Sequence, residues 1–81
     1  MRHHRVLRSN IKAELARADI RGKDAAAAIG ITPAVFSSRL HGRSDWQVRE
    51  LVALADVLQV PVDRLLAGVS GKRTILEDGG L

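Results

Sequence analysis

A three-residue break between two helical segments constrains this chain more than any other feature. Residues 23–29 contain four consecutive alanines and favour a short helix, which Gly30 ends as a C-terminal cap. Thr32 is suited to an N-cap and Pro33 to the first position of a new helix, predicted over 33–41. Two short helices must therefore pack against each other across a very tight turn.

Apolar residues at spacings of three and four predict three further helices. One covers about 9–19 and can start earlier, because Leu7 lies one turn before its apolar stripe. The most regular stripe predicts a helix over about 46–58, and residues 44–47 show the capping-box pattern of Ser followed by Gln. A helix of one to two turns follows Pro61. The predicted fold class is an all-α bundle of five helices.

Composition divides the chain into three parts. Residues 1–8 are basic with little apolar periodicity and predict an N-terminal arm. Residues 9–68 carry the apolar stripes and predict the folded domain, with Gly22 ending its first helix. Residues 69–81 contain three glycines and a β-prone run, so we expect a tail that frays or adds a short strand.

The overall composition excludes several classes of protein. Without Cys, the chain has no disulfide and no thiolate metal site. Its longest apolar run, residues 25–29, is far shorter than the roughly 20 residues of a membrane span, so we expect a soluble cytoplasmic domain. One Trp, one Phe and no Tyr leave few side chains on which single-stranded nucleic acid could stack.

Charge is distributed unevenly along the chain. Residues 1–43 hold nine basic and three acidic residues, a net charge of +6, whereas residues 44–81 carry −2. This asymmetry favours one face for a polyanion and another for packing or a partner. The alternative is that a small domain needs net charge only for solubility.

The two short helices and their Gly-containing turn form a helix-turn-helix motif. Ala26 is small where the two backbones cross, and Ile31 directs the turn into the core. Phe36 and Leu40, four residues apart, anchor the helix 33–41 from behind. The opposite face is small and lightly polar, which suits a groove about 12 Å wide; it consists of Ala34, Ser37, Ser38 and His41.

Resemblance to a known family rests on an ordered set of residues. The set is Ala25-Ala26, Gly30-Ile31-Thr32, Phe36, Leu40-His41-Gly42-Arg43, Leu54-Ala55, Leu58-Gln59-Val60-Pro61-Val62 and Leu65-Leu66. Residues 11–68, which are 58 of the 81, resemble the phage-repressor and Cro type (XRE-like) of helix-turn-helix DNA-binding domain. The resemblance implies a lambda-repressor-like bundle of five helices.

The same resemblance implies that the helix 33–41 enters the major groove of double-stranded DNA with its first residues at the base edges. The candidates for base contact are Pro33, Ala34, Ser37 and Ser38. The candidates for phosphate or base contact are Lys23, Thr32, Arg39, His41 and Arg43, and the arm adds Arg2, Arg5 and Arg8. Relatives often carry Gln, Arg or Asn at the base positions and Gln at position 22, which is Gly here.

Several of these residues also have a simpler structural interpretation. Arg39 can pair with Asp45 or Glu50, and the arginines of the arm can form a solvated tail. Trp46 suits a staple at the start of a helix. The His3-His4 pair has no further ligand beside it, so we expect no metal and, in addition, no cofactor and no small-molecule ligand.

No catalytic pattern is visible. The serines lie in no nucleophile elbow, and no Gly-rich phosphate loop follows a strand, so we do not expect an enzyme. The expected function is sequence-specific regulation of transcription by a phage or bacterial repressor or Cro-like protein at the nucleoid of the host.

Partners other than DNA follow from the family and from the charge. Related domains bind palindromic sites as symmetric dimers, and the candidate dimer contacts here are Leu65, Leu66 and Val69 or the tail residues Ile75 and Leu76. One alternative function is an antitoxin-like protein-interaction module whose acidic half neutralises a partner. Another is an architectural or recombination-directionality factor that binds DNA.

Overall fold

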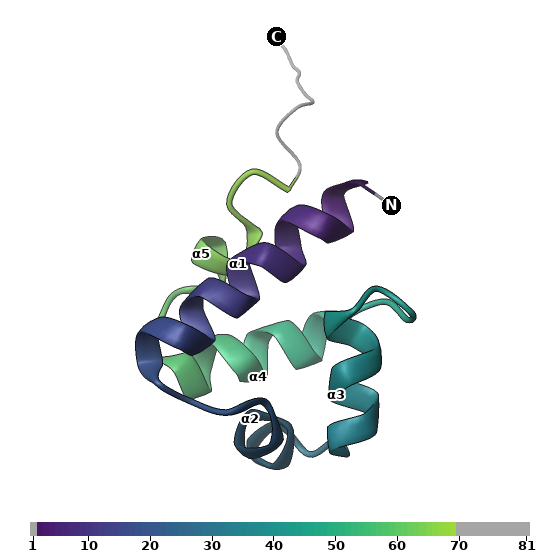
Figure 1. The fold of residues 1–81 in the computed structure, drawn as a ribbon. Helices are drawn as coiled ribbons and strands as arrows, with labels where there is room; N and C mark the ends of the chain where they lie inside the picture. The colour runs from purple at the N-terminus through teal and green to yellow at the C-terminus, as the bar shows by residue number, and fades with distance from the viewer. Residues whose placement is uncertain (1, 70–81) are drawn as a thin grey trace, which may run out of the picture.

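The computed structural model describes the backbone of residues 2–69 and the side chains of residues 5–69. The predicted all-α fold is confirmed, and no strand occurs within residues 2–69. The helices are α1 (Arg2–Ala18), α2 (Gly22–Ile29), α3 (Pro33–Leu40), α4 (Val48–Leu58) and α5 (Val62–Leu66) (Figure 1). None of these helices is long and apolar enough to cross a membrane.

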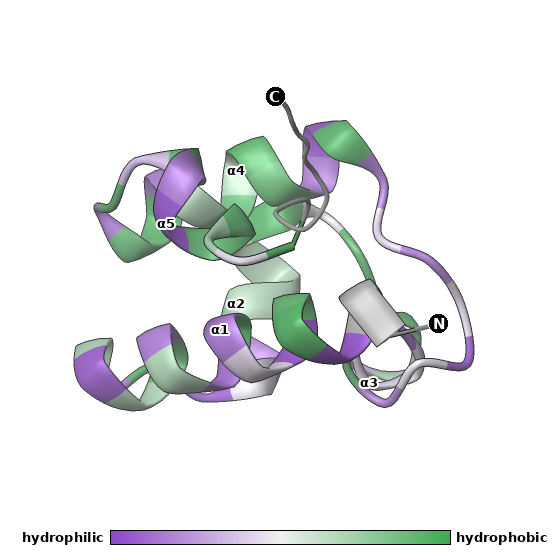
Figure 2. Ribbon diagram, turned by 90° about the horizontal axis from the view of Figure 1, so that it is seen from above, coloured by the Kyte–Doolittle hydropathy of each residue, from purple (hydrophilic) through white to green (hydrophobic). Residues whose placement is uncertain are grey.

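Helix α4 runs through the middle of the bundle and packs against α1, α2 and α5 (Figure 1). Hydrophobic positions concentrate along α4, whereas hydrophobic and hydrophilic positions alternate along α1 (Figure 2). Helix α3 stands at one edge and packs against α2 and α1. The buried apolar core consists of Leu7, Ile11, Leu15, Ala25, Ala26, Phe36, Leu51, Leu54, Ala55, Leu58 and Leu65.

The first helix starts earlier than residue 9, near which the sequence predicts its start. Residues predicted as a basic arm form the first two turns of α1, which begins at Arg2 rather than near residue 9. The physical reason is Leu7, which is 6% exposed and extends the apolar stripe by one turn. Most of the predicted tail, residues 70–81, lies outside the described part of the chain.

The tight turn between α2 and α3 forms as predicted. Gly30 has φ +81°, the left-handed conformation in which glycine caps a helix without strain. The Thr32 hydroxyl accepts a hydrogen bond from the Val35 backbone N–H at 3.1 Å, and Pro33 occupies the first turn. Phe36 is 2% exposed, so the buried side of α3 is fixed against the core.

Two helix ends differ from prediction. Helix α1 ends at Ala18, and Gly22 is the first residue of α2, where a Cβ would meet the Phe36 ring at 3.4 Å. Helix α4 begins at Val48, with Glu50 accepting from the Gln47 backbone N–H at 2.9 Å. The capping box predicted at 44–47 is therefore wrong, because the Ser44 hydroxyl bonds side chains of α3 instead.

Replacing Phe36 by Ala is expected to lower the free energy of unfolding by about 3–5 kcal/mol, because it leaves a cavity where α3 meets the core. Denaturant unfolding followed by far-UV circular dichroism measures this loss. Val48→Ala is the matched control, since Val48 is 76% exposed and its truncation should change stability by no more than about 0.5 kcal/mol. Equal losses in the two variants would contradict the burial of Phe36 as the anchor of α3.

Candidate nucleic-acid interface

The outer side of α3 carries the residues predicted to contact bases. Pro33 and Ala34 are exposed, whereas Ser37 and Ser38 are half-buried. The first turn of α3 therefore offers an apolar surface without long side chains. A helix with such a surface can approach the floor of a groove closely.

Ser37 and His41 form a local pair at the C-terminal end of α3. The Nδ1 atom of His41 lies 2.9 Å from the Ser37 carbonyl oxygen and 3.2 Å from its hydroxyl. The carbonyl can only accept, so this contact is a hydrogen bond in the tautomer that carries the proton on Nδ1, and in that tautomer Nε2 is the unprotonated nitrogen of an exposed ring. His41 thus lies beside the side chains of α3 that are predicted to contact bases.

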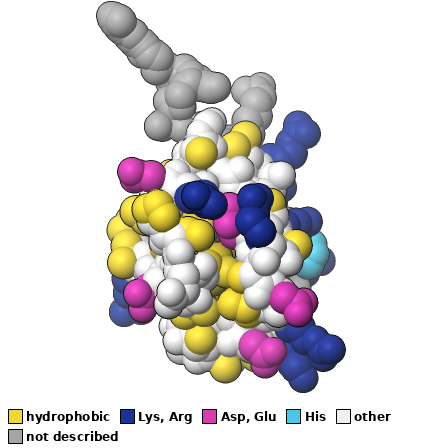
Figure 3. Space-filling model, turned by 90° about the vertical axis from the view of Figure 1, so that its left-hand side faces the viewer, with side chains coloured by type: hydrophobic (Ala, Val, Ile, Leu, Met, Phe, Trp, Pro, Cys, Tyr) yellow, Lys and Arg dark blue, Asp and Glu magenta, His cyan; other side chains and the backbone are white. Residues whose placement is uncertain are grey.

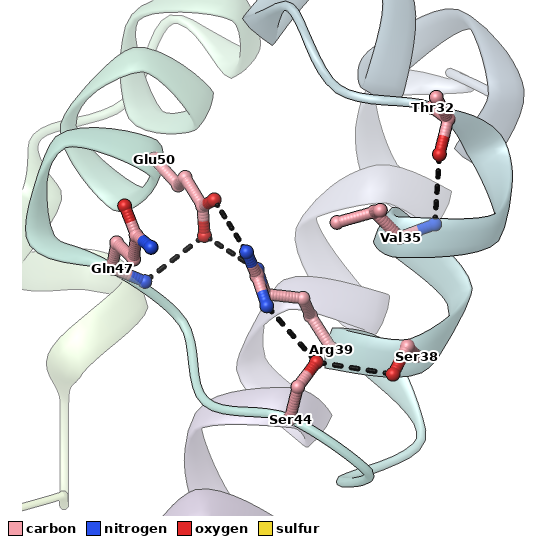
Figure 4. A network of polar contacts seen from close by, with 7 residues as sticks. All are labelled: Thr32, Val35, Ser38, Arg39, Ser44, Gln47 and Glu50. Atoms are coloured by element: carbon pink, nitrogen blue, oxygen red, sulfur yellow. Dashed lines mark hydrogen bonds and ion pairs between the residues drawn. The ribbon is translucent and has the colours of Figure 1, made fainter.

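Arg39 forms the ion pair that the sequence offered as the alternative to a DNA contact. Its Nε lies 2.7 Å from Glu50 Oε1, its NH2 donates to Glu50 Oε2 at 2.9 Å and its NH1 donates to the Ser44 hydroxyl at 2.9 Å (Figure 4). The Arg39 side chain is only 15% exposed. The ion pair with Glu50 is therefore present, and Arg39 ties α3 to the start of α4.

The electrostatics of Glu50 follow from this contact. Burial by itself would raise the pKa of the carboxyl group. Hydrogen bonds from Arg39 and from the Gln47 backbone, together with the charges of Arg39 and Arg49, outweigh burial and lower the pKa below its ordinary value of 4.5. The carboxylate is therefore ionised near neutral pH and holds the guanidinium in place.

Two other predicted cations are exposed on the elements that flank α3. Lys23 lies in the first turn of α2. The N-terminus of this helix lies close to the Phe36 ring, because a Cβ on Gly22 would contact that ring. Arg43 lies in the loop that follows α3, and its backbone N–H donates to the Ser38 carbonyl at 2.8 Å. Thr32, also exposed, uses its hydroxyl as the N-cap of α3.

One basic residue of α1, Arg8, approaches the same loop. A Cβ on Gly42 would lie 2.7 Å from the Arg8 NH1 atom, so the Arg8 guanidinium rests against the backbone next to Arg43. Arg5 is exposed one turn earlier, and the side chain of Arg2 lies outside the described residues. The structure thus brings Arg8 to the α3–α4 loop on a rigid helix instead of a free arm.

Trp46 and Ser44 support this region from the loop. The Trp46 ring meets the Phe36 ring edge to face, with centroids 5.4 Å apart and planes at 84°. The staple predicted for Trp46 is therefore a contact with α3. The sequence predicts only a helix cap for Ser44. Its hydrogen bond with Arg39, five residues earlier, follows no sequence pattern and could not be predicted.

The face of the molecule that lies away from α3 carries a different mixture of side chains from the surface around α3. Figure 3 shows hydrophobic side chains in the middle of this face, with basic and acidic side chains around them. On α1, Glu14 lies 3.8 Å from Arg17 and 4.0 Å from Arg64 of α5. Charges of both signs stand together here, which makes this face less suited to a polyanion.

Comparisons with known protein families, with curated proteins and with solved structures find no match.

Replacing Glu50 by Gln is expected to lower the free energy of unfolding by about 3 kcal/mol near pH 7, because Arg39 keeps its charge without a carboxylate partner. The pKa of Glu50 is lowered by folding, so its contribution is complete above pH 4.5 and is lost as the pH falls through the lower, folded value. Denaturant unfolding at several pH values should therefore show wild type and variant converging below pH 4.5.

The control for this series is Asp56→Asn, which removes an exposed carboxylate from the same helix. It should change stability little at any pH. A pH dependence in Asp56→Asn as large as in Glu50→Gln would contradict the assigned role of the ion pair.

Proposed function

We propose that the protein binds a specific site in double-stranded DNA and regulates transcription there, as a binding protein and not as an enzyme. The observation that carries the proposal is the setting of α3. Its inner side is locked by Phe36 and Arg39, its outer first turn is exposed and small, and exposed Lys23 and Arg43 stand on the flanking elements. This combination suits a helix that enters the major groove between two phosphate contacts.

In this proposal one set of residues provides the affinity for DNA, and another set distinguishes the bases. Lys23, Arg43, Arg8 and Arg5 supply charge for phosphates, which gives binding that weakens with salt. Pro33 and Ala34 offer apolar contact to a thymine methyl group, and Ser37 and Ser38 offer hydroxyls. Arg39 is not included among the DNA contacts, because its guanidinium is held by Glu50 and Ser44.

The proposal includes a symmetric dimer. Leu65 has no exposed surface, so the contact falls to Leu66, which is 38% exposed, and to half-buried Val69. Val6 adds apolar surface beside them, since a Cβ on Gly68 would lie 3.5 Å from its Cγ1. Ile75 and Leu76 lie outside the described residues. Such a dimer would act in the cytoplasm as a phage or bacterial repressor that blocks polymerase at an operator.

Selection of bound fragments from random duplex DNA, followed by footprinting, tests the proposed function. The expected result is one enriched sequence, palindromic with half-sites about one helical turn apart. Enrichment of a single half-site would contradict the proposed dimer but would still support binding to specific DNA. Recovery of unenriched DNA, or of none, would contradict the proposal itself.

Arg43→Ala is expected to weaken binding to the selected site and to lower the slope of log affinity against log salt by about one, because one phosphate contact is lost. Titrations by fluorescence anisotropy at several salt concentrations measure both quantities. Arg64→Ala is the matched control, since Arg64 lies on α5 beside Glu14. If the control lowers the slope as much as Arg43→Ala does, the phosphate contact is assigned to the wrong surface.

A further inference from the structure

Two serine side chains continue from the buried Arg39–Glu50 ion pair to the outer side of α3. Glu50 holds the Arg39 guanidinium, and Arg39 NH1 donates to the Ser44 hydroxyl at 2.9 Å. The Ser44 hydroxyl in turn lies 3.0 Å from that of Ser38 (Figure 4). We call this series, from Glu50 through Arg39 and Ser44 to Ser38, the hydroxyl relay.

The direction of the hydrogen bonds in the relay follows from the cation at its inner end. A guanidinium can only donate, so the Ser44 oxygen always accepts from Arg39. A hydroxyl that accepts from a cation is polarised and becomes a better donor, so the favoured arrangement has the Ser44 O–H donating to the Ser38 oxygen. Ser38 already accepts from Ser44 in this arrangement, so one of its two lone pairs is occupied and its own O–H is left to donate outward, which makes donation the favoured role.

We infer that Ser38 is a specificity-determining residue that presents a fixed hydrogen-bond donor to the DNA, and that Ser44 is a positioning residue that sets this polarity. The inference rests on the proposed function. In the major groove a donor matches the acceptors of guanine, adenine N7 and thymine O4, but not the amino group of cytosine. Cytosine on the contacted strand is therefore the disfavoured base opposite Ser38.

Ser37 provides a comparison within the same helix. Its hydroxyl lies 3.2 Å from His41 Nδ1, an atom whose role depends on the tautomer. No cation fixes the direction of that hydrogen bond. Ser37 is thus a serine on the same helix without an imposed polarity. It belongs to the proposed base contacts, so the control is Ser9→Ala, which alters an exposed serine of α1 outside them.

The experiment uses the full chain and its selected DNA site. Substitution of each base pair in turn identifies the pair whose preference Ser38→Ala alters. Deoxyuridine and deoxycytidine are then compared at this position, because they present an acceptor and a donor at the same place and neither carries the thymine methyl group. Affinities are measured for wild type, Ser38→Ala, Ser44→Ala, Ser44→Thr and Ser9→Ala.

Wild type should favour deoxyuridine about three- to tenfold, the effect of one neutral hydrogen bond. Ser44→Ala should bring this ratio close to one, because a freely turning Ser38 hydroxyl can also accept from cytosine, and Ser44→Thr should restore it. Ser38→Ala should lose the ratio too, whereas Ser9→Ala should keep it.

Three outcomes would overturn the inference. One is equal wild-type affinity for the two sites, another is a Ser44→Ala ratio as large as in wild type, and the third is a Ser38→Ala protein with unaltered preference at every base pair. Each leaves specific binding, and so the proposed function, intact. Failure of the wild type to prefer any duplex sequence would instead contradict the proposed function, and the inference with it.

Discussion

The burial of Phe36 is the constraint on which the arrangement of α3 depends. Its ring is 2% exposed, meets the Trp46 ring edge to face and lies where a side chain on Gly22 would reach it. One aromatic ring thus joins α3 to the N-terminus of α2 and to the loop before α4. Among the buried core residues of the described chain Phe36 is the one aromatic residue, and Trp46 packs against that core from the loop. Leu40 packs against the same core one turn later, so Phe36 and Leu40 together hold the inner side of α3.

Arg39 adds a directional restraint to this nondirectional packing. Hydrophobic burial holds a helix against a core but allows it to rotate or slide slightly, whereas two nitrogens on one carboxylate fix a distance and an angle. A buried ion pair contributes little net stability compared with an apolar pair of similar size. Its value here is geometric, because it joins the last turn of α3 to the first turn of α4.

Most of the fold could be predicted from the sequence, because its signals are local. Gly30, Thr32 and Pro33 determine a turn through their own backbone preferences, and the apolar stripes identify the buried sides of the helices. The sequence leaves the start of α1 open, because Leu7 continues the apolar stripe but the basic residues around it suit a solvated arm equally well. Of the candidate site, exposure of Pro33, Ala34 and the flanking cations agrees with the predicted surface. The role of Arg39 could not be decided, since a cation on the edge of a helix suits a phosphate and a carboxylate equally well.

The same ion pair changes how the proposed interface must work. Once Arg39 is committed to Glu50, no long cationic or amide side chain remains among the base-contact positions of α3, which are Pro33, Ala34, Ser37 and Ser38. Affinity must then come from the cations on α1, α2 and the α3–α4 loop, and these carry no sequence information. Discrimination depends on short hydroxyls and on apolar contact, which act only at close range. A rigid mounting of α3 is therefore a requirement of this interface, because a short side chain cannot compensate for a displaced backbone.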